Sequence, residues 1–315
     1  MKYTSIFHQT RITGIIALSL LAAISLSGKV NTGEDADFLV MNNDPAPLSL
    51  YVVADAHVGS KDKGENMMAF ANLVNRNRPD VVLDLGDTFQ AEITDLYNYG
   101  TPREAAFQQH RDWLRAWNSI EIEHKAVALG NRDIRPETRT DRYTLSEDVW
   151  IASLGYQNNP VRAGSRLLKS LIVNGDDVKA LVFALCTYVD TFSMDEMLSW
   201  VQEEVTAFDG DYIIFGNHHA GVYERLQTVL MENNVQTPAI FLHGHNHGPD
   251  TLVRDAWGLE QDDYYFPSYL VTDLMEKGVA AKFLFYPEGR YEKFRLDVHN
   301  GIISKPVMHH KTRVD

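Results

Sequence analysis

Residues 48–57 read LSLYVVADAH, and this stretch decides how the rest of the chain is interpreted. The apolar run 48–54 has the length and the Leu, Tyr and Val content of a short buried strand. It ends at Asp55 and His57, whose side chains point to one side because residues i and i+2 of an extended chain share a face. Open α/β sheets bind ligands just beyond the carboxyl ends of their strands. The stretch therefore predicts a strand that presents a carboxylate and an imidazole to one ligand.

A short apolar strand followed by polar side chains recurs four more times along the chain. The runs 81–85, 125–129, 212–215 and 239–242 are each followed by residue types that bind metals. These residues are Asp87, Asn131, His218 or His219, His245 and His247. Imidazole, carboxylate and amide oxygen suit divalent Zn, Mn, Fe, Co or Ni. Together with Asp55 and His57 they exceed one tetrahedral site and favour two ions that share a carboxylate.

Glycines precede three of the candidate ligand positions. Gly86, Gly130 and Gly244 are expected to let the backbone turn sharply, so that each ligand faces inward.

Helical and strand patterns alternate over most of the chain. Helices are predicted over 65–76, from a capping box at Thr101 through Trp117, from a second at Ser193 through Phe208, and again up to Met231. Asn174-Gly175 predicts a hairpin that joins 166–173 to 178–185, whereas 134–165 carries little pattern and 268–298 resembles an antiparallel meander. This order predicts an α/β fold with two packed β-sheets flanked by helices.

Composition restricts the partners of the chain. Its 315 residues are 44% hydrophobic and 23% charged, as in soluble globular proteins, and the formal net charge is −14. That charge argues against a nucleic-acid backbone or an anionic membrane as the main partner, and a phosphate-binding site would need local positive charge, for example from metal ions. The single cysteine, Cys186, lies in an apolar run, cannot form an internal disulfide and is expected to be a buried thiol.

The N-terminus has the pattern of an export signal. Residues 12–28 (ITGIIALSLLAAISLSG) are uncharged, short for a membrane span and typical of a secretory hydrophobic region. We expect a signal peptide over 1–28, a polar linker over 29–47, a folded domain over 48–300 and a tail over 301–315. The protein is then exported, to the periplasm or the medium. The alternative is an uncleaved N-terminal membrane anchor.

The ordered motifs resemble a known family. DAH at 55–57, GD at 86–87, GNRD at 130–133, a later histidine and GHNH at 244–247 are similar to the signature of calcineurin-like metallophosphoesterases. The resemblance extends from residue 48 to about 250 and implies a four-layer αββα fold with two divalent ions. One ion would be held by Asp55, His57, Asp87 and His247, and the other by Asp87, Asn131, His218 and His245. A metal-bridging hydroxide would then attack phosphorus in line.

His218 and His219 are both candidates for one ligand position, and Gln90 departs from the family pattern. His218 is preferred as the ligand because the family places its ligand first in an H-x-P-like segment, which leaves His219 to support the site or contact the substrate. Gln90 stands where the family often has an acid, with little expected effect on the metals.

Arg132 is the departure that bears on chemistry. The family usually has a histidine there, oriented by an acidic neighbour such as Asp133, to protonate the leaving oxygen. Arginine cannot give up its proton but can hold a phosphate through two parallel hydrogen bonds. The lack of a proton donor at residue 132 favours substrates with good leaving groups, such as anhydrides. Alternatively, His219, His124 or His243 donates the proton. GNRD, with GDTFQA at 86–91, also resembles the branch that cleaves the pyrophosphate of UDP-diacylglucosamine, although that enzyme works on the cytoplasmic side.

Other conspicuous residues have simpler interpretations. A structural or solvated role is expected for His110, His124, His299, His309 and His310, with incidental metal contact as the alternative for the last two, which lie in a basic tail. A solvated, acid-paired loop, with phosphate binding as the alternative, is expected for Arg135, Arg139 and Arg142. Trp113 and Trp117 share a helix face and are expected in the core rather than stacked on a base.

The sequence thus predicts a metal-dependent phosphoesterase acting on a small-molecule phosphoester or a nucleotide-type substrate. A non-catalytic scaffold for protein partners is the rival. A phosphoprotein phosphatase ranks below both, because the longer signature of that branch is missing.

Overall fold

The computed structural model describes most of the predicted folded domain. The described residues are 45–134, 142–189, 192–247, 251–252, 266–271, 274–287, 289–301 and 307–309. The predicted signal peptide, residues 29–44 of the linker, Arg135, Arg139 and the side chains of His309 and His310 lie outside them. No helix in these ranges is both long enough and apolar enough to cross a membrane.

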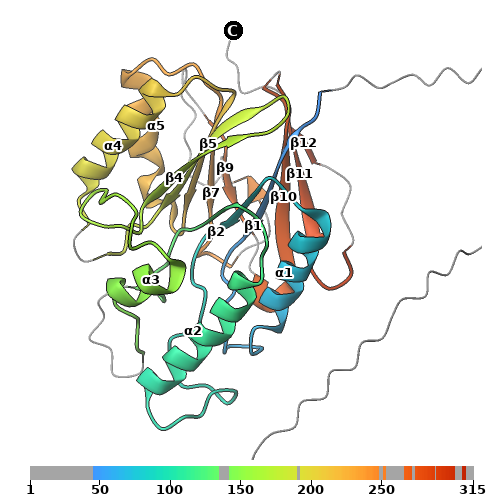
Figure 1. Ribbon diagram of the computed structural model, residues 1–315, viewed down its shortest axis with the longest axis vertical. Helices are drawn as coiled ribbons and strands as arrows, with labels where there is room; N and C mark the ends of the chain where they lie inside the picture. Colours follow the sequence, from blue (N-terminus) through green and yellow to red (C-terminus); the bar gives the residue numbers. More distant parts are fainter. Residues whose placement is uncertain are drawn as a thin grey trace, which may run out of the picture. The chain divides into compact units, whose positions relative to one another are not determined.

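Two sheets, each with six strands in the described residues, form the centre of the fold (Figure 1). The first contains β1 (Leu48–Val53), β2 (Val81–Asp84), β3 (His124–Val127), β10 (Val279–Phe285), β11 (Tyr291–Asp297) and β12 (Val307–His309), in the order β12-β11-β10-β1-β2-β3. The second contains β4 (Lys169–Asn174), β5 (Lys179–Leu185), β6 (Tyr212–Asn217), β7 (Ala239–His243), β8 (Thr251–Leu252) and β9 (Ser268–Leu270), in the order β4-β5-β6-β7-β9-β8. β1, β2 and β3 run parallel, as do β5, β6, β7 and β9. The carboxyl ends of each parallel set therefore meet at one edge.

Alternate residues of the central strands pack into two different hydrophobic clusters. In β1, Leu50 and Val52 join a cluster built from strands of both sheets, which includes Ile214 of β6. Tyr51 and Val53 join the other cluster, which contains the helices. Because both faces of β1 are buried, its sequence reads as a continuous apolar run rather than as an alternation with polar residues.

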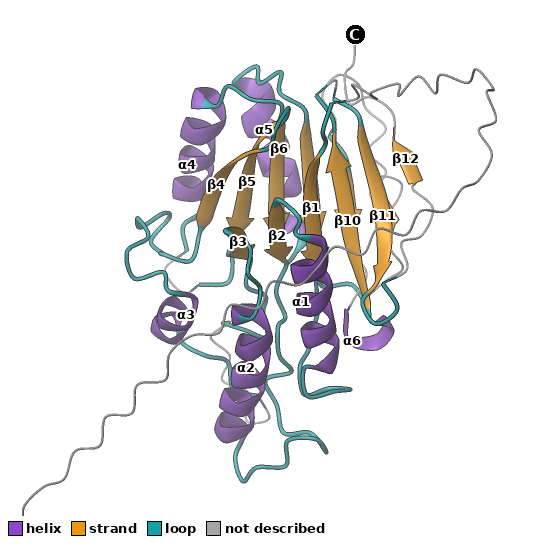
Figure 2. Ribbon diagram, turned by 45° about the vertical axis from the view of Figure 1, so that its right-hand side comes forward, coloured by secondary structure: helices purple, strands orange, loops and turns teal. Residues whose placement is uncertain are grey.

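Helices cover the outer faces of the two sheets. They are α1 (Glu65–Asn77), α2 (Pro102–Asn118), α3 (Glu147–Leu154), α4 (Met194–Ala207), the 3-10 turn η1 (Ala220–Val222), α5 (Tyr223–Glu232) and α6 (Leu274–Lys277). Trp113 of α2 donates a hydrogen bond to Asp84 of β2, and Trp200 of α4 packs edge-on against Phe183 of β5. Figures 1 and 2 show α4 and α5 at one side of the sheets and α1 and α2 at another. The predicted fold class, two packed sheets flanked by helices, is confirmed.

Local signals read from the sequence agree with the helix ends. The Thr101 hydroxyl accepts a hydrogen bond from the Glu104 backbone N–H, and the Ser193 hydroxyl accepts one from that of Glu196. Each hydroxyl satisfies a donor that the first helical turn leaves free. Trp113 and Trp117 stack in the core with ring centroids 5.6 Å apart, as expected.

The structure differs from the expected meander over 268–298. β9 pairs in parallel with β7 in the second sheet, whereas β10 and β11 form an antiparallel pair in the first, and α6 lies between β9 and β10. A pattern of short strands does not reveal which sheet each strand joins. The expected tail after residue 301 also contributes β12, an edge strand paired with β11.

The segment 134–165, which carries little pattern, contains α3. Only Trp150 of this helix is fully buried, so apolar spacing is a weak signal there. The acidic first turn, Glu147-Asp148, and Gly155 in the left-handed conformation at the end are the local signals that mark it.

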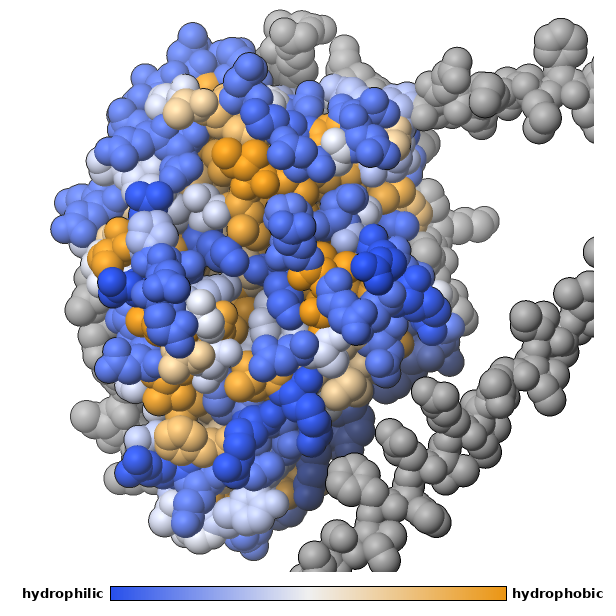
Figure 3. Space-filling view, viewed as in Figure 1, coloured by the Kyte–Doolittle hydropathy of each residue, from blue (hydrophilic) through white to orange (hydrophobic). Residues whose placement is uncertain are grey.

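The molecular surface is mostly hydrophilic on the face seen in Figure 3, where hydrophobic residues show in several separate groups. Among the described residues, the large hydrophobic side chains that are exposed are Ile93, Tyr99, Val161, Ile172 and Met231. Single exposed apolar side chains are normal on soluble proteins.

Gly216 tests the packing of the two sheets against each other. A Cβ at this residue would lie 2.5 Å from Leu83 Cδ2 and 3.2 Å from the Phe183 carbonyl oxygen. Gly216→Ala is therefore expected to lower the free energy of unfolding by about 1–3 kcal/mol, as overpacked cores do, measured by urea denaturation. In a Leu83→Ala background the same change should cost clearly less. An equal cost in both backgrounds would contradict this close packing.

Candidate metal centre

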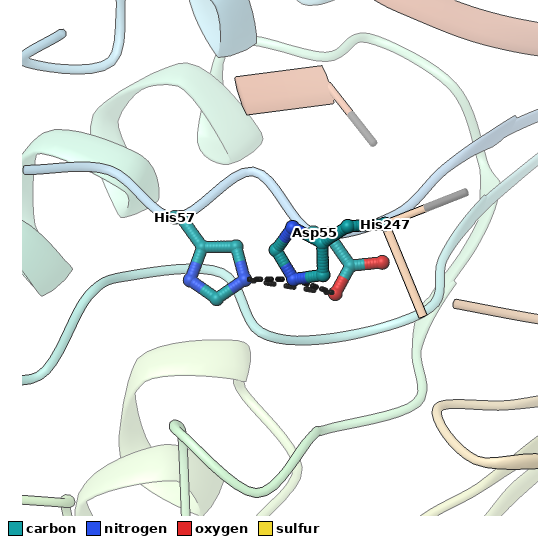
Figure 4. Close-up of side chains that lie close together, drawn as sticks. All are labelled: Asp55, His57 and His247. Carbon is teal, nitrogen blue, oxygen red and sulfur yellow. Dashed lines mark hydrogen bonds and ion pairs between the residues drawn. The ribbon is translucent and has the colours of Figure 1, made fainter. Parts of the chain in front are cut away.

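Asp55, His57 and His247 form the first group of potential ligands. Asp55 and His57 follow β1, and His247 lies beyond β7 in the other sheet. Asp55 Oδ1 is 3.6 Å from Nε2 of each histidine, and the two Nε2 atoms are 3.1 Å apart (Figure 4). Three donor atoms thus converge on one point from two sheets.

Asp87, His218 and His245 form the second group. Asp87 follows β2, whereas the two histidines follow β6 and β7. His218 Nε2 lies 3.4 Å from Asp87 Oδ1 and 3.1 Å from His245 Nδ1. His218 is fully buried and belongs to this ligand group, whereas His219 is not part of the group.

Asp87 faces both groups. Its Oδ1 lies toward His218, and its Oδ2 is 3.7 Å from His57 Nε2 of the first group. The two oxygens of one carboxylate therefore point to different clusters. This is the arrangement that a bridging ligand between two ions requires.

The backbone at the ligand positions is strained. Five of the candidate ligands have positive φ, between 39° and 75°: Asp55, His57, Asp87, His245 and His247. Non-glycine residues rarely adopt this conformation, and they keep it only where surrounding interactions enforce it. The N–H groups of Asp55 and His57 donate to the carbonyls of Gly86 and Asp87, which ties the first ligand turn to the second.

Of the three glycines that the sequence predicts to turn the backbone, only Gly86 does so. Gly86 has φ +90°, so it does provide a turn. Gly130 and Gly244 do not have positive φ. A Cβ at Gly244 would lie 2.6 Å from Asp55 Oδ2, and one at Gly130 would overlap Asp87 Oδ1. Their role is to leave room for the carboxylates, which corrects the expectation of sharp turns.

The donor set fits divalent ions. Asp55 Oδ1 and Asn131 Oδ1 are buried side-chain oxygens without a hydrogen-bond partner, a costly arrangement unless another group satisfies them. His218 Nδ1 donates to the Leu85 carbonyl at 2.9 Å, which leaves Nε2 with its lone pair toward Asp87 when the ring is neutral. Carboxylate, imidazole and amide oxygen are suitable ligands for the ions predicted from the sequence.

The carboxylates and imidazoles of the centre shift one another's pKa values. Burial disfavours ionisation of Asp87, but the facing imidazoles of His218 and His57 outweigh it and hold the pKa of Asp87 well below its usual range. Burial alone would lower the pKa of His218, yet Asp87 and the other nearby carboxylates raise it to about 9. A cation in the second group would therefore replace a proton that the carboxylates attract.

Asp133 lies directly behind the ligand turns. Its carboxylate is fully buried and accepts hydrogen bonds from the backbone N–H groups of Gly130, Asp87 and Thr88 and from the Thr88 hydroxyl. Burial and the Asp87 carboxylate raise the pKa of Asp133 to about 6. All of these contacts are to the protein, so Asp133 acts by positioning Asp87 and the 130–133 turn.

Arg132 and His219 lie at the margin of the two groups. The Arg132 backbone N–H donates to Asp87 Oδ1, whereas its guanidinium contacts the Gln90 carbonyl and the Glu92 carboxylate. His219 packs edge-on against His245, with ring centroids 4.9 Å apart. Its Nδ1 accepts a hydrogen bond from the Gly221 N–H, so the proton of the neutral ring lies on Nε2.

The alternative proton donors lie in less suitable places. His124 begins β3, at the opposite end of that strand from Asn131. His243 is fully buried, and burial lowers its pKa to about 4. Of the histidines expected to be structural, His110 is buried against Trp150, and His299 contacts Asn66.

Sequence reasoning missed Asp84 and Glu92. Asp84 is fully buried in β2 and accepts hydrogen bonds from the Gly86 N–H and the Trp113 indole. Burial, with the neighbouring Asp133 carboxylate, raises its pKa to about 8. A charge inside the apolar run 81–85 was a readable signal for Asp84. No sequence signal pairs Glu92 with Arg132.

Comparison with known proteins yields a family and a fold. The family model for calcineurin-like phosphoesterases matches residues 48–249. A purple acid phosphatase from yellow lupin (Lupinus luteus) seeds shares 12% identity with a TM-score of 0.55, over 84% of this chain and 53% of the lupin chain. This chain thus spans about half the length of that protein. The GAP50 anchor in the inner membrane complex of Plasmodium is 11% identical with a TM-score of 0.46, over 86% and 92% of the two chains. No curated protein matches significantly.

Asp133→Asn tests the positioning of the ligand turns. The amide would turn a donor toward backbone N–H groups that need an acceptor, so we expect a loss of about 1–3 kcal/mol in the free energy of unfolding. Metal affinity, measured by titration calorimetry with Mn, should fall about 10–100-fold. The control Asp148→Asn, at an exposed residue of α3, should change stability by less than about 0.5 kcal/mol. Unchanged metal affinity in Asp133→Asn would contradict this role.

Proposed function

Because the chain belongs to the calcineurin-like phosphoesterase family, we propose that it is a metal-dependent hydrolase that cleaves phosphoester or phosphoanhydride bonds at a dinuclear centre formed by the two ligand groups. The observation that supports this most directly is the position of Asp87, whose two oxygens face different groups. Asp55, His57 and His247 would hold one ion, His218, His245 and Asn131 the other, and Asp87 both. Paired divalent ions supply an activated water and stabilise charge on the attacking and leaving oxygens. Mn, Zn, Fe, Co and Ni all suit these ligands.

Arg132 and His219 are proposed to act on the substrate. Arg132 can hold a phosphate oxygen and stabilise charge that develops on it, but it cannot protonate a leaving group. His219 presents a donor Nε2–H, which can hydrogen-bond to a leaving oxygen. Without a strong general acid, the centre favours substrates with good leaving groups, such as a phosphate released from an anhydride.

The substrate is proposed to be a small phosphoester or a nucleotide-type molecule. The net charge of −14 argues against a nucleic-acid backbone. The GNRD turn at 130–133 is similar to the branch that cleaves the pyrophosphate of UDP-diacylglucosamine, which supports an anhydride. The proposed export signal argues against that particular molecule, because the enzyme of that branch works on the cytoplasmic side.

A non-catalytic scaffold is the second candidate. It would need no buried ligand set, whereas the described residues keep six converging donors and an unpartnered Asn131 oxygen. On the face shown in Figure 3 the hydrophobic residues lie in separate groups, which gives a protein partner no single continuous patch there.

Hydrolysis of model substrates tests the proposed function. With Mn added, the protein is expected to hydrolyse bis-p-nitrophenyl phosphate, and Asp87→Ala should lower kcat/KM at least about hundredfold because it removes the shared ligand. Asp209→Ala, at an exposed carboxylate after α4, is the control and should retain activity. Metal content is measured in each protein. A folded, metal-loaded protein without turnover of any phosphoester would favour the scaffold.

A nucleoside diphosphate-sugar should be cleaved faster than an alkyl phosphomonoester, and the opposite order would refute the anhydride preference.

The N-terminal segment is proposed to direct export. When the whole chain is expressed in a bacterial host, we expect a periplasmic or secreted protein whose mass lacks the residues up to about 28. A full-length protein in the membrane fraction would instead identify an anchor. A full-length cytoplasmic protein would contradict both alternatives. Cell fractionation with mass spectrometry distinguishes these outcomes.

A further inference from the structure

The Arg132 guanidinium is already engaged by a carboxylate. Its Nη1 lies 3.1 Å from the Gln90 carbonyl oxygen and 3.3 Å from Glu92 Oε1. The Gln90 side-chain amide donates to the same Glu92 oxygen. Both charged side chains keep partial solvent exposure, 22% for Arg132 and 28% for Glu92, so a solute can reach the pair.

The segment that carries Glu92 is rigidly held. The Gln90 N–H donates to the Val58 carbonyl, and the Ala91 carbonyl accepts from the Tyr143 N–H. Gln109, fully buried on α2, accepts from the Ala91 N–H at 2.9 Å and donates to the Glu92 carbonyl at 2.8 Å. Ala91 has φ 66°, an unfavourable conformation that this network enforces. The fold therefore fixes the backbone at Glu92, and the Gln90 amide and the Arg132 guanidinium both contact its carboxylate.

Arg132 contacts the metal centre through its backbone. The backbone N–H of Arg132 donates to Asp87 Oδ1 at 2.8 Å, so the residue that carries the guanidinium directly contacts the central ligand. The Glu92 carboxylate places a formal negative charge beside the Arg132 guanidinium, the cation that would bind the substrate phosphate.

We propose that Glu92 is a specificity-determining residue that positions Arg132 and disfavours phosphorus centres carrying two negative charges. The inference rests on the proposed function of the centre. A phosphomonoester is a dianion at mildly alkaline pH, whereas a phosphodiester or an internal anhydride phosphate carries one charge per phosphorus. A carboxylate beside the cation that binds the phosphate repels a dianion more strongly than a monoanion, and partial burial of the Arg132–Glu92 pair weakens screening by salt. The centre then prefers diesters and internal anhydrides over monoesters.

The experiment compares Glu92→Gln with the matched variant Glu92→Asp, which keeps the charge on a shorter side chain. Each Mn-loaded protein is assayed on p-nitrophenyl phosphate and bis-p-nitrophenyl phosphate. Calorimetry then gives the dissociation constants for inorganic phosphate and for dimethyl phosphate, a readout that needs no turnover. In Glu92→Gln, the monoester-to-diester ratio of kcat/KM and the relative affinity for inorganic phosphate should both rise about three- to tenfold. Both ratios should stay near wild type in Glu92→Asp, even if absolute rates fall because Arg132 moves.

Asp95→Asn, at an exposed carboxylate three residues away, controls for a general effect of net charge. Unchanged ratios in Glu92→Gln, or an equal rise in Asp95→Asn or Glu92→Asp, would overturn the inference. A wild-type protein that binds metal and phosphate but hydrolyses no phosphoester would instead refute the proposed function, and the calorimetric ratio would still decide the role of Glu92.

Discussion

Buried negative charge is the constraint on which the site depends. Four carboxyl groups, those of Asp55, Asp84, Asp87 and Asp133, lie within the fold at 3% exposure or less. A buried carboxylate is costly unless it is paired, hydrogen-bonded or neutralised by a proton. Asp84, Asp87 and Asp133 are each stabilised in a different way. Burial favours the protonated form of Asp84, backbone N–H groups surround Asp133, and imidazoles face Asp87. Asp55 Oδ1 keeps no hydrogen-bond partner, and a divalent cation would satisfy it.

The two sheets have to be packed in one relative position for this centre to form. Asp55, His57 and Asp87 follow strands of the first sheet, and the histidines that face them follow β6 and β7 of the second. The inner cluster of Leu50, Val52 and Ile214 holds the sheets together, and Gly216 allows Leu83 to approach the second sheet closely. Packing between the sheets thus sets the distance between the ligands, and the strained ligand turns are supported from both sides.

Much of this was predictable from the sequence because strand ends are local features. The order of helical and strand patterns predicted two sheets with flanking helices, and five apolar runs, each followed by ligand-type residues, predicted the ligands at the strand ends. The order of sheet pairing was less accessible, because the run at 268–270 carries no signal for joining β7 rather than β10. Conformation at the ligands was also hidden: positive φ at Asp55 or His245 follows from hydrogen bonds to distant residues. The need for glycine at 130 and 244 likewise arises from carboxylates elsewhere in the chain.

The pairing of Arg132 with Glu92 shows how such distant contacts change the meaning of a motif. Read from the sequence, GNRD replaces a proton donor with a permanent cation beside the metals. In the fold, that cation carries its own counter-ion, held in place by Gln109 through the backbone of Ala91 and Glu92. At the proposed centre, the local field on a substrate phosphate would then be less positive than the field that arginine and two metal ions alone would produce. Because electrostatic selectivity depends on the sum of nearby charges, the substitution at 132 cannot be interpreted without residue 92.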